Sequence, residues 1–242
     1  MERLKLTGNK RTVLIALSVA FIAVETAIYV CIHTSSGRGF ARSAFASIVL
    51  AFCFSFLPLV IPNRDGTLIR LGMLFTVVAD FFLVFLDPVN ELAGVLVFSL
   101  VQFCYFAYIF KRHSKNKQRI IHLSVRAAIT LILLIMPPIV LGDGADALVY
   151  CSVFYYGQLL CNLLFALLDG RLKLFAVGLF LFAMCDLSIG LNEMAGTYLG
   201  AEPGTFLYAL NHTGINLAWV FYLPSQTLIP LSLMRFNRGN KI

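Results

Sequence analysis

The sequence predicts an all-α polytopic membrane protein with eight transmembrane helices, and three observations lead to this fold class. First, 60% of the 242 residues are hydrophobic and only 13% are charged, whereas soluble domains carry about a quarter charged residues. Second, the apolar residues gather in runs long enough to cross a bilayer. Third, the basic residues fall almost entirely on one side of these runs. This composition excludes disordered, coiled-coil, collagen-like and disulfide-stapled secreted proteins.

The apolar runs define the predicted spans in order. A helix needs about 20 apolar residues to cross the hydrocarbon core. Eight segments qualify and make residues 1–242 one integral membrane domain: 12–33, 42–61, 67–86, 91–110, 120–141, 145–168, 172–192 and 207–234. The first run is too long and uninterrupted for a removable signal peptide, so we expect it to be a span. Short linkers rich in Gly, Pro, Asn and Asp separate the runs and make consecutive helices antiparallel neighbours.

The distribution of charge predicts the orientation. With eight spans, all of the 19 Lys and Arg residues except Arg38 and Arg42 share one side with both termini. By the positive-inside rule, both termini are cytoplasmic. The net charge of +7 is therefore an orientation signal, and we expect membrane lipids rather than nucleic acid as partners. The expected location is the bacterial cytoplasmic membrane.

The third and seventh spans resemble each other. Each has a Gly followed, after seven residues, by an Asp: Gly72 and Asp80 in the third span, Gly178 and Asp186 in the seventh. Because the two spans lie four apart, they run in the same direction. The pattern favours two four-helix halves in a parallel repeat, and the alternative is coincidence in a biased composition. Both Asp residues lie at the same predicted depth.

Three acidic residues lie inside the predicted spans, namely Glu25, Asp80 and Asp186. A carboxylate in hydrocarbon costs several kcal/mol, so each needs a reason to be there. We assign the other charged side chains to loops, termini and helix ends. The structural alternative for each acid is a hydrogen bond to a neighbouring helix. Further polar side chains on helix faces can line a cavity with the acids: Gln102, Tyr105, Gln158, Asn162, His212, Asn216, Tyr222 and Gln226.

Signatures of soluble enzymes and of metal sites are absent from the sequence. It contains no nucleophile elbow, zinc-protease helix, phosphate-binding loop or dinucleotide fingerprint. The six Cys residues lie inside apolar runs and form no C-x-x-C pair, and the four His residues are scattered. We therefore expect no metal, no cofactor and no disulfide framework.

Two pairs of segments resemble the YhhN-type membrane family, which includes the lysoplasmalogenases. Residues 74–83 read LFTVVADFFL and residues 94–105 read GVLVFSLVQFCY, similar to the family patterns of the third and fourth spans. Residues 178–189 and 222–229 resemble two later patterns. The resemblance extends over about residues 70–232. Gln102 stands where the family pattern has His, Ala79 where it has Gly, and Cys185 where it has Ser.

The resemblance implies hydrolysis of the vinyl-ether bond of a lysoplasmalogen to a fatty aldehyde and a glycerophospho-head group. Our hypothesis is that Asp80 and Asp186 are the catalytic acid and base. The substrate-binding residues would be Glu25 and the eight polar residues given above. Two alternatives remain open: a small-solute or proton-coupled transporter, and a lipid-binding membrane protein without catalysis.

Overall fold

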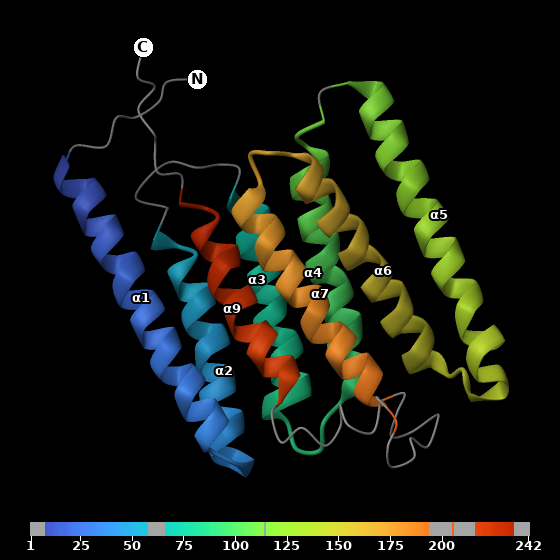
Figure 1. The fold of residues 1–242 in the computed structure, drawn as a ribbon, viewed down its shortest axis with the longest axis horizontal. Helices are drawn as coiled ribbons and strands as arrows, with labels where there is room; N and C mark the ends of the chain where they lie inside the picture. Colours follow the sequence, from blue (N-terminus) through green and yellow to red (C-terminus); the bar gives the residue numbers. More distant parts are fainter. Residues whose placement is uncertain (1–7, 58–65, 114, 194–204, 206–215, 235–242) are drawn as a thin grey trace.

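The described part of the chain is a bundle of helices without β-strands (Figure 1). The computed structural model describes residues 8–57, 66–113, 115–193, 205 and 216–234. Its elements are α1 (Gly8–Thr34), α2 (Gly37–Phe54), α3 (Thr67–Asp80), the π-helical turn η3 (Phe81–Phe85), α4 (Glu91–Phe110), α5 (Asn116–Leu141), the short 3-10 turn η4 (Gly142–Gly144), α6 (Ala147–Leu168), α7 (Lys173–Glu193) and α9 (Leu217–Leu231). The predicted all-helical class is confirmed for these residues.

Seven helices in the described residues are long and apolar enough to cross a membrane, as expected of an integral membrane protein. They are the helices from α1 to α7, with η3 extending α3 to Phe85. The apolar helix α9 is shorter, at 15 residues. Most of the segment before it, on which the predicted eighth span begins, lies outside the described residues. The number eight therefore stays a prediction.

Three helices begin earlier than the sequence predicts, and α1 does so at Gly8 rather than at residue 12. Helix α2 begins at Gly37 rather than at residue 42, because Gly37 adopts a φ of +56°, a left-handed conformation that reverses the chain directly after α1. Helix α5 begins at Asn116 rather than at residue 120. The earlier start of α5 matters for the interior, since it places Arg126 about 15 Å along the helix axis from the first residue.

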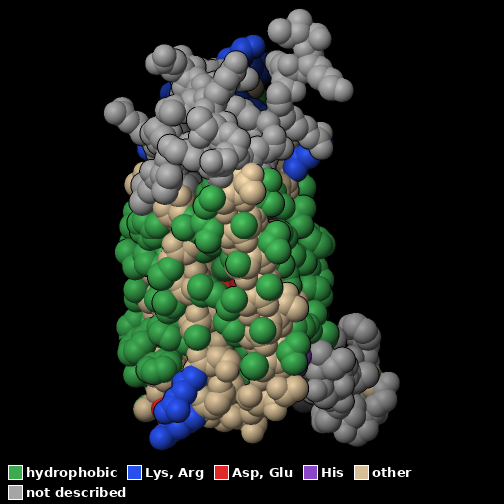
Figure 2. Space-filling model, turned by 90° about the vertical axis from the view of Figure 1, so that its left-hand side faces the viewer, with side chains coloured by type: hydrophobic (Ala, Val, Ile, Leu, Met, Phe, Trp, Pro, Cys, Tyr) green, Lys and Arg blue, Asp and Glu red, His purple; other side chains and the backbone are tan. Residues whose placement is uncertain are grey.

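Successive helices run in opposite directions, so α1 starts and α9 ends at the same end of the bundle (Figure 1). We call it the basic end, because cations gather at the helix boundaries there, among them Arg70, Lys111, Arg112, Arg171 and Lys173. Arg38 and Arg42 lie at the start of α2, at the opposite end. Between the ends, the face shown in Figure 2 is mostly hydrophobic, with Lys and Arg near the ends alone.

The helices pack in the same order in the two halves of the chain. In the first half, α1 packs on α2, α2 on α3, and α3 most extensively on α4. In the second half, α5 packs on α6, α6 on α7, and α7 most extensively on α9. The halves meet where α4 packs on α6 and α2 on α9, while α1 and α5 lie at the flanks (Figure 1).

The two matching glycines lie at the most extensive helix contact of each half. A Cβ on Gly72 of α3 would clash with the ring of Tyr105 of α4. A Cβ on Gly178 of α7 would lie 2.9 Å from Cγ1 of Ile229 of α9. Each glycine therefore permits one of the two most extensive helix pairs, and each precedes its Asp by the same number of residues.

The flanking helices expose apolar side chains that a water-soluble protein would bury. Val19 of α1 is 61% exposed and Ile139 of α5 is 70% exposed. Large side chains such as Leu159, Phe182 and Leu223 fill the interior, each 2% exposed or less. The outer surface thus fits contact with lipid, and the polar groups described next lie inside it.

Candidate functional site

Asp80 is the last residue of α3 and lies in the interior, where it is 2% exposed. The hydroxyl of Tyr222, from α9, donates a hydrogen bond of 2.5 Å to its Oδ2. Directly after Asp80 the helix widens into the π-helical turn η3. Wide turns of this kind interrupt regular helices rarely and occur often at functional sites.

Asp186 lies in α7, half-buried, and receives a matching hydrogen bond. The hydroxyl of Tyr155, from α6, donates to its Oδ2 at 2.5 Å. Ring contacts through Phe98 and Phe182 join Tyr155 to Tyr222 and so relate the two carboxyl groups in space. We call Asp80, Asp186, Tyr155 and Tyr222 the carboxyl cluster. Among the described residues, no cation forms an ion pair with either carboxyl group.

Aromatic rings surround the carboxyl cluster. Phe98 of α4 lies 5.6 Å from Tyr155 and 5.6 Å from Phe182, between ring centroids. Phe182 in turn lies 5.5 Å from Tyr222, and Trp219 packs on Tyr222 at 5.4 Å. Few other polar groups compete for the carboxyl groups, and electrostatic interactions are stronger in such apolar surroundings than in water.

Glu25, the third acid predicted inside the spans, lies in a different place. It is 4% exposed at the contact between α1 and α2, where the Ser47 hydroxyl donates a hydrogen bond to its Oε2. Its Oε1 has no hydrogen-bond partner in the described part of the chain. No hydrogen bond or ion pair links Glu25 to the carboxyl cluster, so the structure does not bring the three acids together.

A second polar group, which we call the arginine network, forms around Arg126 of α5. Its Nη1 donates to Oε1 of Gln158 and its Nη2 donates to Oδ1 of Asn162, both from α6. Asn162 Nδ2 donates to Oε1 of Gln102, from α4, at 3.0 Å. The structure therefore brings the predicted residues Gln102, Gln158 and Asn162 together, but around a cation rather than around the carboxyl groups.

The assignment of every Lys and Arg to loops, termini and helix ends is wrong for Arg126. Its side chain is 8% exposed and buried among α4, α5 and α6. The reason is the direction of its side chain, which faces α6 and α4 and contacts Gln158, Asn162 and the Phe106 ring. Arg70, in the first turn of α3, is also buried, and its Nε donates to the carbonyl of Ser55 at 2.9 Å.

Helix α6 connects the two groups. Tyr155, Gln158 and Asn162 follow one another at helical spacing on one face. Tyr155 and Gln158 are separated by about 4.5 Å of helix rise. The arginine network lies on the side of the carboxyl cluster toward the basic end, since α6 ends there. Tyr155 is absent from the predicted site residues, although its helical spacing to Gln158 and Asn162 is a signal that points to it, and nothing in the sequence indicates that Asp186 is its partner.

The remaining predicted site residues are dispersed. Tyr105 is fully buried against Phe175, at 5.3 Å between ring centroids. Gln226 of α9 is 1% exposed, and its amide atoms have no hydrogen-bond partner in the described residues. Asn216 is exposed and directly precedes α9. His212 lies outside the described residues.

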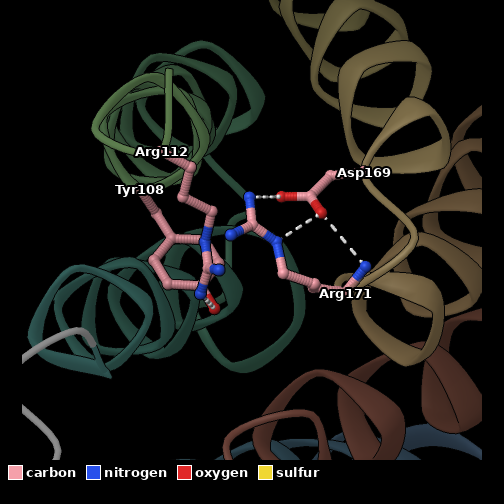
Figure 3. A network of polar contacts seen from close by, with 4 residues as sticks. All are labelled: Tyr108, Arg112, Asp169 and Arg171. Atoms are coloured by element: carbon pink, nitrogen blue, oxygen red, sulfur yellow. Dashed lines mark hydrogen bonds and ion pairs between the residues drawn. The ribbon is translucent and has the colours of Figure 1, made fainter. Parts of the chain in front are cut away.

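The basic end holds a different kind of polar contact (Figure 3). Arg171 folds back on Asp169 between α6 and α7, and donates to both carboxylate oxygens at 2.8 and 2.9 Å. These hydrogen bonds hold the pKa of Asp169 below its usual range. Beside them, Arg112 lies over the ring of Tyr108 and donates to its hydroxyl at 2.8 Å. Burial also lowers the pKa of His113, in the same region.

Comparison with known proteins identifies the family. The profile of the YhhN family matches residues 39–233, which include the carboxyl cluster and the arginine network. Searches of curated proteins and of solved structures found no match for the chain. The matched region contains every described helix except α1 and the first residues of α2. The resemblance noted from the Asp-containing spans is confirmed, and the chain belongs to the YhhN family.

Proposed function

We propose that the protein is a membrane-embedded hydrolase that cleaves the vinyl-ether bond of lysoplasmalogen, releasing a fatty aldehyde and a glycerophospho-head group. Membership of the YhhN family is consistent with an activity of this kind. The observation that carries the proposal is the carboxyl cluster: Asp80 and Asp186 lie in an apolar interior, each held by a tyrosine hydroxyl. Ring contacts through Phe98 and Phe182 join the two tyrosines.

Vinyl-ether hydrolysis begins with the transfer of a proton to carbon, and this step requires an acid in its neutral form. Two negative charges side by side in an apolar interior cost more than one, so we propose that the pair holds one proton. The neutral carboxyl group transfers this proton to the β-carbon of the vinyl ether. The double bond supplies the electrons of the new C–H bond, and the positive charge spreads over the α-carbon and the ether oxygen.

The second carboxylate completes the reaction. It stabilises the oxocarbenium ion and accepts a proton from the water that adds to the α-carbon, giving a hemiacetal. Glycosidases place a pair of carboxyl groups around a similar cation. The C–O bond to glycerol then breaks. The glycerol oxygen takes a proton from the second carboxyl group, and the hemiacetal hydroxyl returns a proton to the first. Both carboxyl groups regain their starting states.

Tyr155 and Tyr222 are positioning residues in this scheme. Each hydroxyl fixes one carboxylate oxygen and leaves the other for the substrate or water. Gln102 hydrogen-bonds with Asn162 of the arginine network. The scheme needs no proton from it, so Gln in place of the family His is compatible with the reaction.

The proposal includes a topology. We propose eight spans in two parallel four-helix halves, with both termini and the basic end in the cytoplasm. The equal packing order of the halves and the matching glycines support the repeat. The grouping of cations at one end supports the orientation.

A transporter is the second candidate. Parallel repeats with carboxyl groups between them are also a feature of secondary transporters. The equal packing order of the two halves therefore favours the transporter candidate as well. A transporter would move protons or a solute across a vesicle membrane without changing the solute.

The test uses purified protein with two lipids of equal chain length and head group. One carries the vinyl ether and the other carries a saturated ether. We expect fatty aldehyde from the vinyl ether alone, because only a vinyl ether gains an oxocarbenium ion by protonation at carbon. Absence of aldehyde from both lipids would contradict the hydrolase proposal, and solute or proton flux in vesicles would then favour the transporter.

A further inference from the structure

The arginine network has more buried hydrogen-bond donors than acceptors to pair with them. The side-chain oxygens of Gln158, Asn162 and Gln102 each accept a hydrogen bond within the network. Two buried donors have no partner in the described residues, Nε of Arg126 and Nε2 of Gln102. Both belong to side chains that are less than a tenth exposed. A group that completes the network must therefore supply oxygen atoms that accept hydrogen bonds.

The network also lacks a negative charge. The partners of Arg126 are amide oxygens, the His122 ring, whose Nε2 lies 3.5 Å from Nη2, and the Phe106 ring, whose centroid lies 4.3 Å from Cζ, and none of these carries a full negative charge. Within the described ranges no Asp or Glu forms an ion pair with Arg126, and the Arg–Asp pair of the basic end involves Arg171. A buried guanidinium without a counter-ion is costly, and charged side chains inside membranes are generally paired.

Arg70 differs from Arg126 in its depth along the helix bundle. It is buried in the first turn of α3 and donates to a backbone carbonyl, but it lies at the basic end. Arg126 lies deeper and next to the carboxyl cluster, because Gln158 and Tyr155 occupy successive turns of α6. Of the two buried cations, Arg126 is the one that a substrate of the carboxyl cluster could reach.

We propose that the arginine network binds the phosphate group of a single-chain glycerophospholipid, with Arg126 as the counter-charge. Arginine suits this role because its planar donors match phosphate oxygens. The free N–H groups of Arg126 and Gln102 donate to the phosphate. The identity of the lipid rests on the proposed function, whereas the need for an anion rests on the network alone.

This site fixes how the lipid lies in the bundle. The phosphate lies toward the basic end, the glycerol spans the turn of α6 between Gln158 and Tyr155, and the ether bond meets the carboxyl cluster. The polar path continues from Arg126 through His122 to His113, whose Nε2 lies 2.9 Å from Nδ1 of His122. The chain then points to the opposite end, as in a lipid of the leaflet at the basic end.

Binding rather than turnover tests the site, because binding does not depend on hydrolysis. Trp219 is the only Trp of the chain and packs on Tyr222, so its fluorescence can report an occupied site in detergent micelles. The ligands are a saturated-ether lysophospholipid and the alkylglycerol of equal chain length, which lacks phosphate. Neither can be hydrolysed as a vinyl ether. Inorganic phosphate and glycerophosphate serve as competitors.

We expect the wild-type protein to bind the lysophospholipid about 30-fold more tightly than the alkylglycerol, the scale of one buried charge contact. Arg126→Gln should abolish this preference and leave alkylglycerol binding unchanged. Arg126→Lys, which keeps the charge but not the paired donors, should retain part of it. Arg70→Gln removes the other buried cation and should keep the full preference.

Three results would overturn the proposal: no preference in the wild-type protein, a full preference in Arg126→Gln, or equal loss in Arg70→Gln. Should Arg126→Gln fail to fold, a full preference in Arg126→Lys would overturn the paired-donor contact. Competition by inorganic phosphate as strong as that of the lipid would assign the site to free phosphate and overturn the lipid assignment. A preference that depends on Arg126 without any aldehyde release would keep this site and refute the hydrolase.

Discussion

Asp169 and the two acids of the carboxyl cluster are the same residue type in opposite surroundings. Asp169 lies at the basic end, where a guanidinium holds both its oxygens (Figure 3). Asp80 and Asp186 lie in the interior, where each is held by a phenol hydroxyl and no cation pairs with it in the described part of the chain. A cation keeps a carboxylate charged, whereas a phenol leaves it able to gain and lose a proton. The comparison indicates which Asp residues are suited to catalysis.

The largest effect is expected from removing either interior carboxyl group. Asp80→Asn and Asp186→Asn should each lower aldehyde release by about 10²- to 10⁴-fold, the usual contribution of a general acid or base. An amide can neither give nor accept the proton. Folded yield in size-exclusion chromatography should be retained, since Asn keeps the shape and accepts the Tyr hydrogen bond. Asp169→Asn is the matched control, and equal loss of activity in all three variants would remove the distinction.

The next effect is expected from the hydroxyl groups that hold the carboxyl groups. Tyr222→Phe and Tyr155→Phe should each lower kcat by about 10- to 150-fold, because a hydrogen bond to a charged group contributes about 1.5–3 kcal/mol. Tyr156→Phe is the matched control, since Tyr156 lies beside Tyr155 and donates to the Ala183 carbonyl at 3.4 Å. Unchanged kcat in both test variants would show that the hydroxyl groups do not position the carboxyl groups.

A smaller effect concerns pH at the basic end. Burial lowers the pKa of His113 in the folded protein, so the unfolded chain takes up a proton first as the pH falls. The stabilising contribution of neutral His113 to the folded protein is fully present above the pKa that His113 has in the unfolded chain. It is lost as the pH falls from that value to the lower pKa of the folded protein. Thermal unfolding at pH 7.5 and pH 5.5 should show a smaller loss on acidification for His113→Gln than for wild type. An identical loss would contradict the assignment.

The smallest effect is expected from the ion pair of the basic end. Asp169→Asn should lower the free energy of unfolding by about 0.2–1 kcal/mol, because the Arg171 side chain is 70% exposed and screened by water. The lowered pKa of Asp169 gives the pair its stabilising effect above the unfolded pKa, and the effect is lost as the pH falls through the folded pKa. Thermal unfolding in low and high salt measures it. A difference that persists in high salt would contradict solvent screening.

The sequence was sufficient to identify those site residues whose type is rare inside an apolar run. Charges are scarce in apolar runs, so Asp80 and Asp186 were identified together with the matching glycines of their spans. The position of Tyr222 on the last helix was also identified, although its hydrogen bond to Asp80 joins residues far apart in the chain. Helical periodicity gave the shared face of Gln158 and Asn162, since this depends on one helix alone.

The sequence was insufficient to predict which neighbouring helix a buried side chain contacts. Arg126 lies near a loop with several cations and was grouped with them, because the sequence does not show that its side chain faces α4 and α6. Glu25 was grouped with the other acids on depth, but its helix packs against α2 at the flank. Depth places a residue along the membrane normal and gives no information on which helix it faces.

Hydrolysis in ¹⁸O-labelled water tests the central claim most directly. Purified protein would be incubated with vinyl-ether lysophospholipid, and the products analysed by mass spectrometry. Protonation at carbon followed by addition of water to the α-carbon leaves the ether oxygen with glycerol. We therefore expect fatty aldehyde together with a glycerophospho-head group that contains no ¹⁸O. Absence of aldehyde, or ¹⁸O in the glycerol fragment, would contradict the carboxyl mechanism.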